Sequence, residues 1–184
     1  MGSSMFFSLI QSVLDKMGSM YRKRVVRERA KSCGRDLAVY GKIYLINTNI
    51  SIGNNVKLYP GIQFFGDGEI SIGDNVSIGN NVMIYASEGA GIEIGDNTNI
   101  AAQCYLVDMD HGMKKGRLIR NQANDVSRII IGEDVWIGAN ATILKGVSIK
   151  NGAVVGAKSL VNKNVEENAI VAGVPAHAIG NRKE

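Results

Sequence analysis

The sequence predicts an all-β solenoid, a parallel β-helix with a triangular cross-section, and two observations support this. The first is a column of aliphatic residues at a strict spacing of six: Ile131, Ile137, Ile143, Ile149, Val155 and Val161. The second is a glycine followed by Asn or Asp after several such residues, as in Gly53-Asn54 and Gly73-Asp74. Neither the helical period of about 3.6 nor the strand period of two explains a period of six. The backbone must therefore turn every six residues.

The same register recurs upstream and sets the number of coils. Its members there are Ile46, Ile52, Leu58, Phe64, Ile72, Ile78, Ile84, Ile94, Ile100 and Leu106. Gly, Asn and Asp tolerate the backbone conformations that tight corners need. Three sides make a coil of about 18 residues, and the aliphatic residues of successive coils stack in the core at roughly the spacing of paired strands. The repeat predicts about five coils, within a β-helix domain at residues 41–181.

Composition and charge exclude several classes of protein. Hydrophobic residues form 45% of the 184, enough for one core, and no apolar run is long enough to span a bilayer. Cys33 and Cys104 are far apart and predict neither a disulfide framework nor a metal cluster, so we expect a cytoplasmic protein, with the inner face of the membrane as an alternative. Residues 1–35 carry a net charge of +6 and the remainder −2. The main body therefore lacks a basic surface for nucleic acid.

The first forty residues form a separate segment that we expect to be helical over 5–32. Its apolar residues are spaced by threes and fours: Phe6, Ile10, Val13, Leu14, Met17 and Tyr21. Solenoids cover their open ends, so we favour a helix that caps the first coil. The alternative is peripheral contact with an anionic membrane, because the segment continues into a basic stretch from Arg22.

The register is lost between Leu106 and Ile131, and a smaller break runs from Tyr85 to Gly91. An irregular connection as long as residues 107–130 is usually functional in a compact domain. This loop contains His111, one of only two histidines in the chain. A lone loop histidine is more often solvated than catalytic, so composition alone leaves its role open.

The hexads, together with the segment Ile131-Gly132-Glu133-Asp134-Val135-Trp136-Ile137-Gly138-Ala139 and the later Val171-Ala172-Gly173-Val174-Pro175-Ala176, resemble the hexapeptide-repeat acyltransferases. The similar branch includes maltose, galactoside and capsular or O-antigen sugar O-acetyltransferases and the xenobiotic acetyltransferases. The resemblance covers about residues 46–181. It implies a left-handed β-helix, acetyl-CoA as the acyl donor, and a homotrimer whose sites lie at subunit interfaces.

The resemblance also places an essential histidine on the extended loop, at His111. An imidazole can take a proton from a sugar hydroxyl and return it to a thiolate, so we expect His111 to be the general base. Asp108, Asp110 or a backbone carbonyl are candidates to orient its ring. We expect acceptor contacts from Tyr85, Asp108 and Asp110, direct attack without a covalent intermediate, and oxyanion stabilisation by the backbone N–H of Gly138 or Ala139.

The donor is expected along the C-terminal coils. By resemblance, the Trp136 indole covers the acetyl or pantetheine end, although an exposed platform is the alternative. The remaining expected contacts are Gly138, Ala139, Gly156 and Ala157 along the pantetheine arm, Lys158, Lys163 and Arg182 at the phosphates, and His177 against the adenine. His177 stands where sugar acetyltransferases often have arginine. Lys145 and Lys150 are interpreted as solvated corners.

These residues favour an acetyl-CoA-dependent O-acetyltransferase of a sugar or saccharide hydroxyl, in capsule, O-antigen or exopolysaccharide synthesis. One alternative is transfer to an amino-sugar amine or to an antibiotic hydroxyl. From another class, the alternative is a non-catalytic scaffold or an ice-binding surface, although the latter would need regular threonine columns. A zinc carbonic anhydrase of this fold needs three histidine ligands and the chain has two, so no metal is expected.

Overall fold

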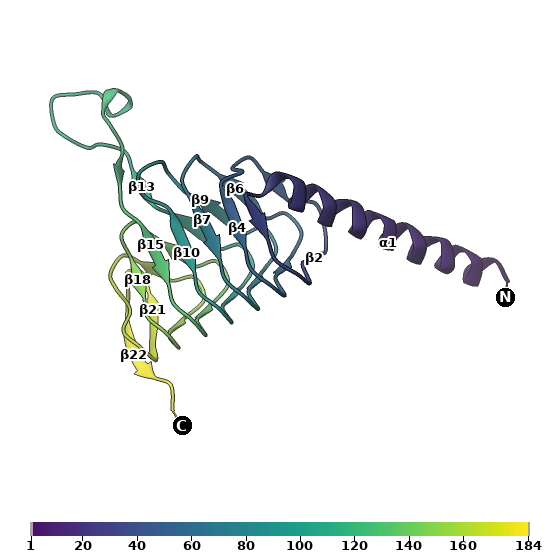
Figure 1. Ribbon diagram of the computed structural model, residues 1–184. Helices are drawn as coiled ribbons and strands as arrows, with labels where there is room; N and C mark the ends of the chain where they lie inside the picture. Colours follow the sequence, from purple (N-terminus) through teal and green to yellow (C-terminus); the bar gives the residue numbers. More distant parts are fainter. Residues whose placement is uncertain (1, 184) are drawn as a thin grey trace.

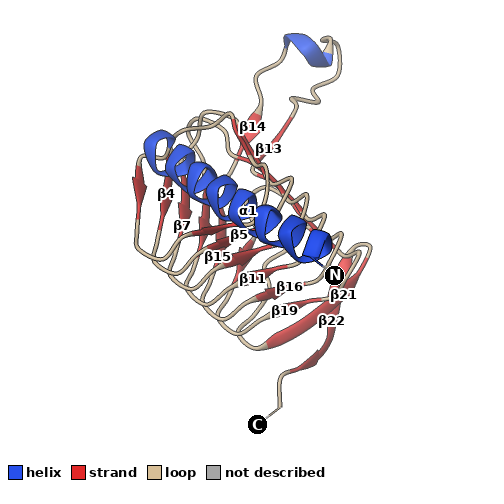
Figure 2. Cartoon of the chain, turned by 90° about the vertical axis from the view of Figure 1, so that its right-hand side faces the viewer, coloured by secondary structure: helices blue, strands red, loops and turns tan. Residues whose placement is uncertain are grey.

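The computed structural model describes residues 2–183. Side chains of residues 2–6, 9, 10, 12 and 13 lie outside that description, and these include Phe6, Ile10 and Val13 of the expected apolar pattern. One helix, α1 (Gly2–Arg29), precedes a triangular prism of short strands (Figures 1 and 2). The prediction of a left-handed parallel β-helix with an N-terminal helix and a protruding loop is confirmed. No helix in residues 2–183 is long and apolar enough to cross a membrane.

Three sheets form the faces of the prism. The first contains β1 (Ser32–Cys33), β4 (Ile50–Ile52), β7 (Ile70–Ile72), β10 (Ile92–Ile94), β15 (Ile129–Ile131) and β18 (Ser148–Ile149). The second contains β2 (Ala38–Val39), β5 (Lys57–Leu58), β8 (Ser77–Ile78), β11 (Asn99–Ile100), β16 (Trp136–Ile137), β19 (Val154–Val155), β21 (Ala169–Gly173) and β22 (Ala176–Asn181). The third contains β3 (Tyr44–Leu45), β6 (Gln63–Phe65), β9 (Met83–Tyr85), β12 (Tyr105–Val107), β17 (Thr142–Ile143) and β20 (Leu160–Val161).

Parallel pairing stacks the aliphatic residues of successive coils inside the prism. Ile52 pairs with Ile72, and Ile72 with Ile94, in the first sheet, and Ile78 pairs with Ile100 in the second. Their side chains are almost completely buried in one continuous core. At the end of the second sheet, β22 turns back antiparallel to β21. Burial of the hexad residues therefore stabilises the whole stack, at about 25 cal/mol for each Å² of apolar surface.

The structure has six strands in the first and third sheets, so the expectation of about five coils is one short. The additional coil begins at Ser32, before residue 41, because the helix ends at Arg29. The register also differs at Ile46, which is 60% exposed instead of buried. Here the neighbouring Asn47 turns inward, and its side-chain nitrogen donates to the Gly68 carbonyl at 2.8 Å. A polar cross-link between coils thus replaces the expected aliphatic residue.

The coils differ in length, and the difference falls at the edge between the third and first sheets, which we call the loop edge. Consecutive core positions across this edge are 7, 8, 10, 25 and 6 residues apart in the pairs Leu45–Ile52, Phe64–Ile72, Ile84–Ile94, Leu106–Ile131 and Ile143–Ile149. The other two edges keep spacings of six. Successive insertions therefore lie above one another along a single edge of the prism.

The last turns of α1 close the first coil. Val26 is 1% exposed and belongs to the core. Arg22 Nε donates to the Val39 carbonyl at 3.3 Å, and Arg27 Nη2 to the Gly34 carbonyl at 3.2 Å. Beyond these contacts the helix leaves the prism, as Figure 1 shows, and Figure 2 shows it across the end of the stack.

Asn47→Ala tests the polar cross-link of the first two coils. The change leaves the Gly68 carbonyl and the Asn49 N–H, which donates to Asn47 Oδ1 at 2.7 Å, without their partner. We expect a loss of about 1–3 kcal/mol in the free energy of unfolding, measured by urea denaturation. Thr48→Ala, at an exposed neighbouring position, is the control. Equal stability of the two variants would contradict a structural role for Asn47.

Candidate active site

A two-stranded hairpin carries His111 away from the loop edge (Figures 1 and 2). Its strands are β13 (Met109–Asp110) and β14 (Asp125–Val126), paired antiparallel with Asp110 opposite Asp125. The next position in this register sets His111 opposite Asn124, and His111 Nδ1 lies 3.1 Å from Asn124 Oδ1. Because a carboxamide oxygen only accepts, Nδ1 carries the proton and the lone pair of Nε2 is available as a base.

Asn124, which holds the His111 ring, was not among the residues predicted from the sequence. Asp108 was a candidate to orient the His111 ring and to contact the acceptor. In the structure its side chain binds backbone N–H groups instead. The Asp108 side chain is fully buried and accepts hydrogen bonds from the Ser87 N–H at 2.9 Å and the Gly91 N–H at 2.7 Å. It therefore fixes the shape of the preceding insertion. Only the antiparallel register of the loop could have indicated Asn124.

Lys145 holds the base of the hairpin, and its interpretation as a solvated corner is wrong. Asp110 and Asp125 face each other across the hairpin, where like charges repel. Lys145 Nζ hydrogen-bonds Asp125 Oδ2 and lies 3.6 Å from Asp110 Oδ2. The hydrogen bond with Asp125, followed by the charges of both carboxylates, raises the pKa of Lys145. Asp110 is thus engaged in an ion pair directly below His111.

A polar cavity of about 330 Å³ lies at the foot of the hairpin. Its lining residues come from three successive insertions along the loop edge: Gly66, Asp67, Tyr85, Ser87, Glu88, Asn124 and Val126. Tyr85, which was expected to contact the acceptor, is one of these lining residues. The Ser87 hydroxyl is buried and has no hydrogen-bond partner among residues 2–183. Because Asn124 both lines this cavity and contacts His111, an acceptor in the cavity would lie beside the imidazole.

The expected donor contacts lie along a second edge, between the second and third sheets, which we call the amide edge. Gly138-Ala139 and Gly156-Ala157 stack there in consecutive coils. The Gly138 N–H donates to the Val155 carbonyl at 2.8 Å. The N–H groups of Ala139 and Ala157 have no acceptor within the described part of the chain. An extended ligand with amide carbonyls could therefore bind these groups.

The edge between the first and second sheets shows why these amides are free. At the equivalent corner there, Asp74 Oδ1 accepts from the Asn54 N–H at 2.6 Å and Asp96 Oδ1 from the Asp74 N–H at 2.7 Å. In both of these pairs the side chain of one coil thus caps an amide of the coil before it. Alanine has no side-chain acceptor, so Ala157 leaves the Ala139 amide uncapped. The change from Gly-Asn or Gly-Asp to Gly-Ala is a sequence signal for this site.

Trp136 lies on the outer face of the second sheet, between Asn99 and Val154 in register, and is 56% exposed. Its indole lines a groove of about 330 Å³ with Tyr59, Ser77, Gly79, Asn80, Asn99, Ile100, Ala101 and Ala102. This groove runs toward the amide edge, since Ala101 and Ala102 precede Gly138 and Ala139 in the same stack. The placement suits an aromatic wall of a ligand groove.

The expected phosphate contacts divide into two groups. Lys163 and His177 are exposed and share a cavity of about 360 Å³ at the C-terminal end of the prism, and Lys158 is exposed at the amide edge. Arg182 is instead engaged by the prism itself: its Nη1 lies 2.7 Å from Asp134 Oδ2 and 3.1 Å from the Gly152 carbonyl. The phosphate contact expected of Arg182 stays a prediction, and it would compete with this ion pair.

The His111 hairpin and the amide edge lie on opposite sides of the third sheet. A side of six residues spans about 20 Å in extended conformation. The hairpin of β13 and β14 projects outward from the loop edge (Figure 2). The hairpin and the amide edge are therefore separate features of one chain.

Comparison with known proteins identifies the family of the chain. "Bacterial transferase hexapeptide (six repeats)" matches residues 128–163, and "Hexapeptide repeat of succinyl-transferase" matches residues 69–107. The putative lipopolysaccharide biosynthesis O-acetyl transferase WbbJ of Escherichia coli is 36% identical over 141 aligned residues, and the match covers 71% of each chain. The chain belongs to the hexapeptide-repeat acyltransferases.

Two further relatives define the donor of this acyltransferase. The galactoside O-acetyltransferase of Escherichia coli is 33% identical over 158 residues, 86% of this chain and 67% of that protein. The N-acyltransferase AntD of Bacillus cereus, solved with dTDP-4-amino-4,6-dideoxyglucose and coenzyme A, superposes with a TM-score of 0.78 at 26% identity, covering 88% and 89% of the two chains. The protein is thus an acetyl-CoA-dependent acyltransferase.

Ala157→Asn tests the free amides. By analogy with Asp74, the new side chain would cap the Ala139 N–H and withdraw it from the donor. One lost hydrogen bond predicts a KM for acetyl-CoA raised about fivefold to tenfold, with thermal stability retained. Ala157→Gly, which keeps the amide free, is the control. An unchanged KM in Ala157→Asn would separate these amides from donor binding.

Lys145→Met tests the clamp below His111. Without the cation, the two facing aspartates repel and the imidazole loses its position, so we expect kcat to fall about tenfold to a hundredfold. The KM for acetyl-CoA should stay constant, because the amide edge is untouched. Lys150→Met is the matched control, since Lys150 pairs only with the exposed Glu166. A kcat that falls equally in both variants would argue against a positioning role.

Proposed function

We propose that this acyltransferase is an O-acetyltransferase that modifies a sugar hydroxyl in the synthesis of capsule, O-antigen or exopolysaccharide, with His111 as the general base. The observation that carries the proposal is the His111–Asn124 pair beside a polar cavity. The relatives WbbJ and galactoside O-acetyltransferase support a saccharide acceptor. The cavity fits such a ligand, because its lining combines a tyrosine, a serine, carboxylates and an amide.

The proposed reaction is a direct transfer. Nε2 of His111 removes the proton of the acceptor hydroxyl while its oxygen attacks the thioester carbonyl. Negative charge develops on the carbonyl oxygen, and this oxygen accepts a hydrogen bond from the Ala139 N–H. Gly138, the other expected donor, is excluded because its N–H is already bound to the Val155 carbonyl. When the C–S bond breaks, the imidazolium returns its proton to the CoA thiolate, giving an acetyl ester and CoA.

We propose a homotrimer as the active form, in which the hairpin of one subunit meets the amide edge of the next. These two features lie apart on one chain, and this separation supports the assembly. Each chain would contribute its hairpin to one site and its amide edge to another. A C3 arrangement closes the set of three such contacts. Trp136 would then form a wall of the groove between subunits.

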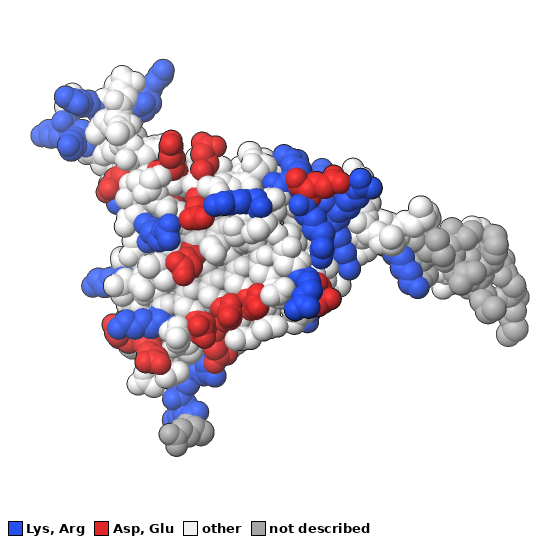
Figure 3. Space-filling model, in the orientation of Figure 1, with Lys and Arg blue, Asp and Glu red and all other residues white. Residues whose placement is uncertain are grey.

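The tip of the loop gives further information on the acceptor. It carries Lys114, Lys115, Arg117 and Arg120, and residues 111–124 contain no acidic residue. Figure 3 shows this cluster of cations extending from the body. The Gln122 side chain holds the tip by bonding both backbone groups of Lys114 and the Arg117 carbonyl. Four cations beside the base favour a sugar that carries a phosphate group.

An amine acceptor is the second candidate, and the likeness to the N-acyltransferase AntD favours it. The two candidates differ in the group that the base must deprotonate. Acceptor competition decides between them: an amino sugar and its hydroxyl counterpart are compared by kcat/KM under the same conditions.

His111→Ala tests the proposed base. We measure CoA thiol release from acetyl-CoA with neutral sugars, phosphate-bearing sugars, amino sugars and chloramphenicol as acceptors. Loss of the base predicts a decrease in kcat of about 10²- to 10⁴-fold with the oligomer intact. Asn124→Ala should give a smaller decrease, and Asn124→Asp, which keeps an acceptor oxygen, should restore part of it. Asn121→Ala, at the exposed loop tip, is the control.

Acceptor-dependent turnover that persists in His111→Ala would overturn the role of this residue as the base. Turnover restricted to amino sugars would mean that the acceptor group is an amine and not a hydroxyl.

A further inference from the structure

The outer part of α1 exposes a row of large apolar side chains. Leu14, Met17, Met20 and Tyr21 are between 56% and 71% exposed. At 3.6 residues per turn, Leu14, Met17 and Tyr21 fall within about 60° of one another, so they form a stripe along one side of the helix. We call these four residues the apolar stripe.

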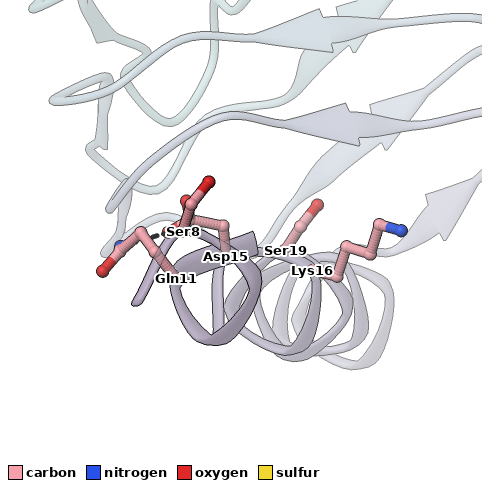
Figure 4. A pocket seen from close by; sticks show the side chains of 5 residues that line it. All are labelled: Ser8, Gln11, Asp15, Lys16 and Ser19. Atoms are coloured by element: carbon pink, nitrogen blue, oxygen red, sulfur yellow. Dashed lines mark hydrogen bonds between the residues drawn. The ribbon is translucent and has the colours of Figure 1, made fainter. Parts of the chain in front are cut away.

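The apolar stripe points away from the prism. Val26, which packs in the core, follows Met17 by nine residues, or about two and a half turns, and therefore lies on the opposite side of the helix. That opposite side is polar in the projecting part, where Figure 4 shows Ser8, Gln11, Asp15, Lys16 and Ser19 together. Gln11 Nε2 donates to Asp15 Oδ1 at 3.1 Å. The helix is thus amphipathic, and its own prism cannot bury the stripe.

The charge of this region restricts what could cover the stripe. Residues 1–35 contain eight Lys or Arg and two acidic residues, for a net charge of +6. Figure 3 shows a blue cluster where the helix meets the body. A second copy of the helix would bring two such segments together and repel. An anionic bilayer surface instead matches both properties, because it takes up apolar side chains and attracts cations.

We propose that α1 is a membrane-surface helix that places the apolar stripe in the interface of an anionic phospholipid bilayer. Amphipathic helices with cationic flanks lie in the plane of such interfaces, with the apolar face at the headgroup boundary. Lys16 and Lys23, about two turns apart on the polar side of the helix, add attraction to the negative surface potential of the bilayer, which extends over about a Debye length. Val26 packs in the core of the first coil, so a helix bound to the bilayer would keep the prism at the membrane surface. This inference does not depend on the identity of the acceptor.

The test is co-sedimentation of the full-length protein with vesicles. We expect binding to vesicles of phosphatidylcholine with phosphatidylglycerol and little binding to phosphatidylcholine alone. Leu14→Ser combined with Met17→Ser should weaken binding about tenfold, since two apolar side chains no longer enter the interface. Ser8→Ala combined with Ser19→Ala, on the polar side, should bind as wild type. Turnover of a soluble acceptor should be equal in all of these variants.

A second variant removes positive charge without disturbing the helix. Lys16→Gln combined with Lys23→Gln retains good helix formers and should weaken binding to anionic vesicles about tenfold, as should a raised salt concentration. Wild-type protein that stays in solution with anionic vesicles overturns the proposal. So does a change of oligomeric state in the Leu14/Met17 variant by analytical ultracentrifugation, because the stripe would then be an interface between copies of this chain.

Discussion

The fold depends on backbone hydrogen bonds between successive coils, and these bonds require every side of the prism to keep the same length. Ile52, Ile72 and Ile94 can stack only if the chain returns to the same place after each coil. Additional residues therefore cannot enter a strand and must leave the prism at a corner. In this chain they all leave at the loop edge, where Asn47 and Asp108 satisfy the displaced amides and carbonyls. The cavity and the His111 hairpin are consequences of that restriction.

The two halves of the proposed active site arise by opposite changes to the same repeat. At the loop edge, residues are added until a hairpin forms, and Lys145 from the next coil neutralises the carboxylates that the hairpin brings together. At the amide edge, side chains are reduced to alanine, and backbone groups capped elsewhere by Asn or Asp become available. Because these edges bound one sheet, a rigid prism keeps them apart and favours assembly of the site between subunits.

Much of this could be predicted from the sequence, because a period of six has few physical explanations. The hexads gave the fold class, and the break in register located the loop and His111. The first coil escaped notice because it lacks the aliphatic-glycine pair, and Ile46 was misplaced because a buried Asn47 interrupts the column. Asn124, Lys145 and the ion pair of Arg182 depend on contacts between residues 13 to 48 positions apart in sequence, which no local pattern encodes.

The helix α1 differs from the rest of the chain because the stacking constraint does not act on it beyond its last turns. In the prism, side-chain character is dictated by whether a position faces the core or the outside of a coil. Along the projecting helix no such demand exists, so nothing in the fold requires Leu14, Met17 and Tyr21 to share one side. An apolar stripe in a segment free of packing constraints needs a cause outside the monomer. The net positive charge around it favours an anionic surface as that cause. The helix would then determine where the enzyme is located, and the prism would carry out acyl transfer.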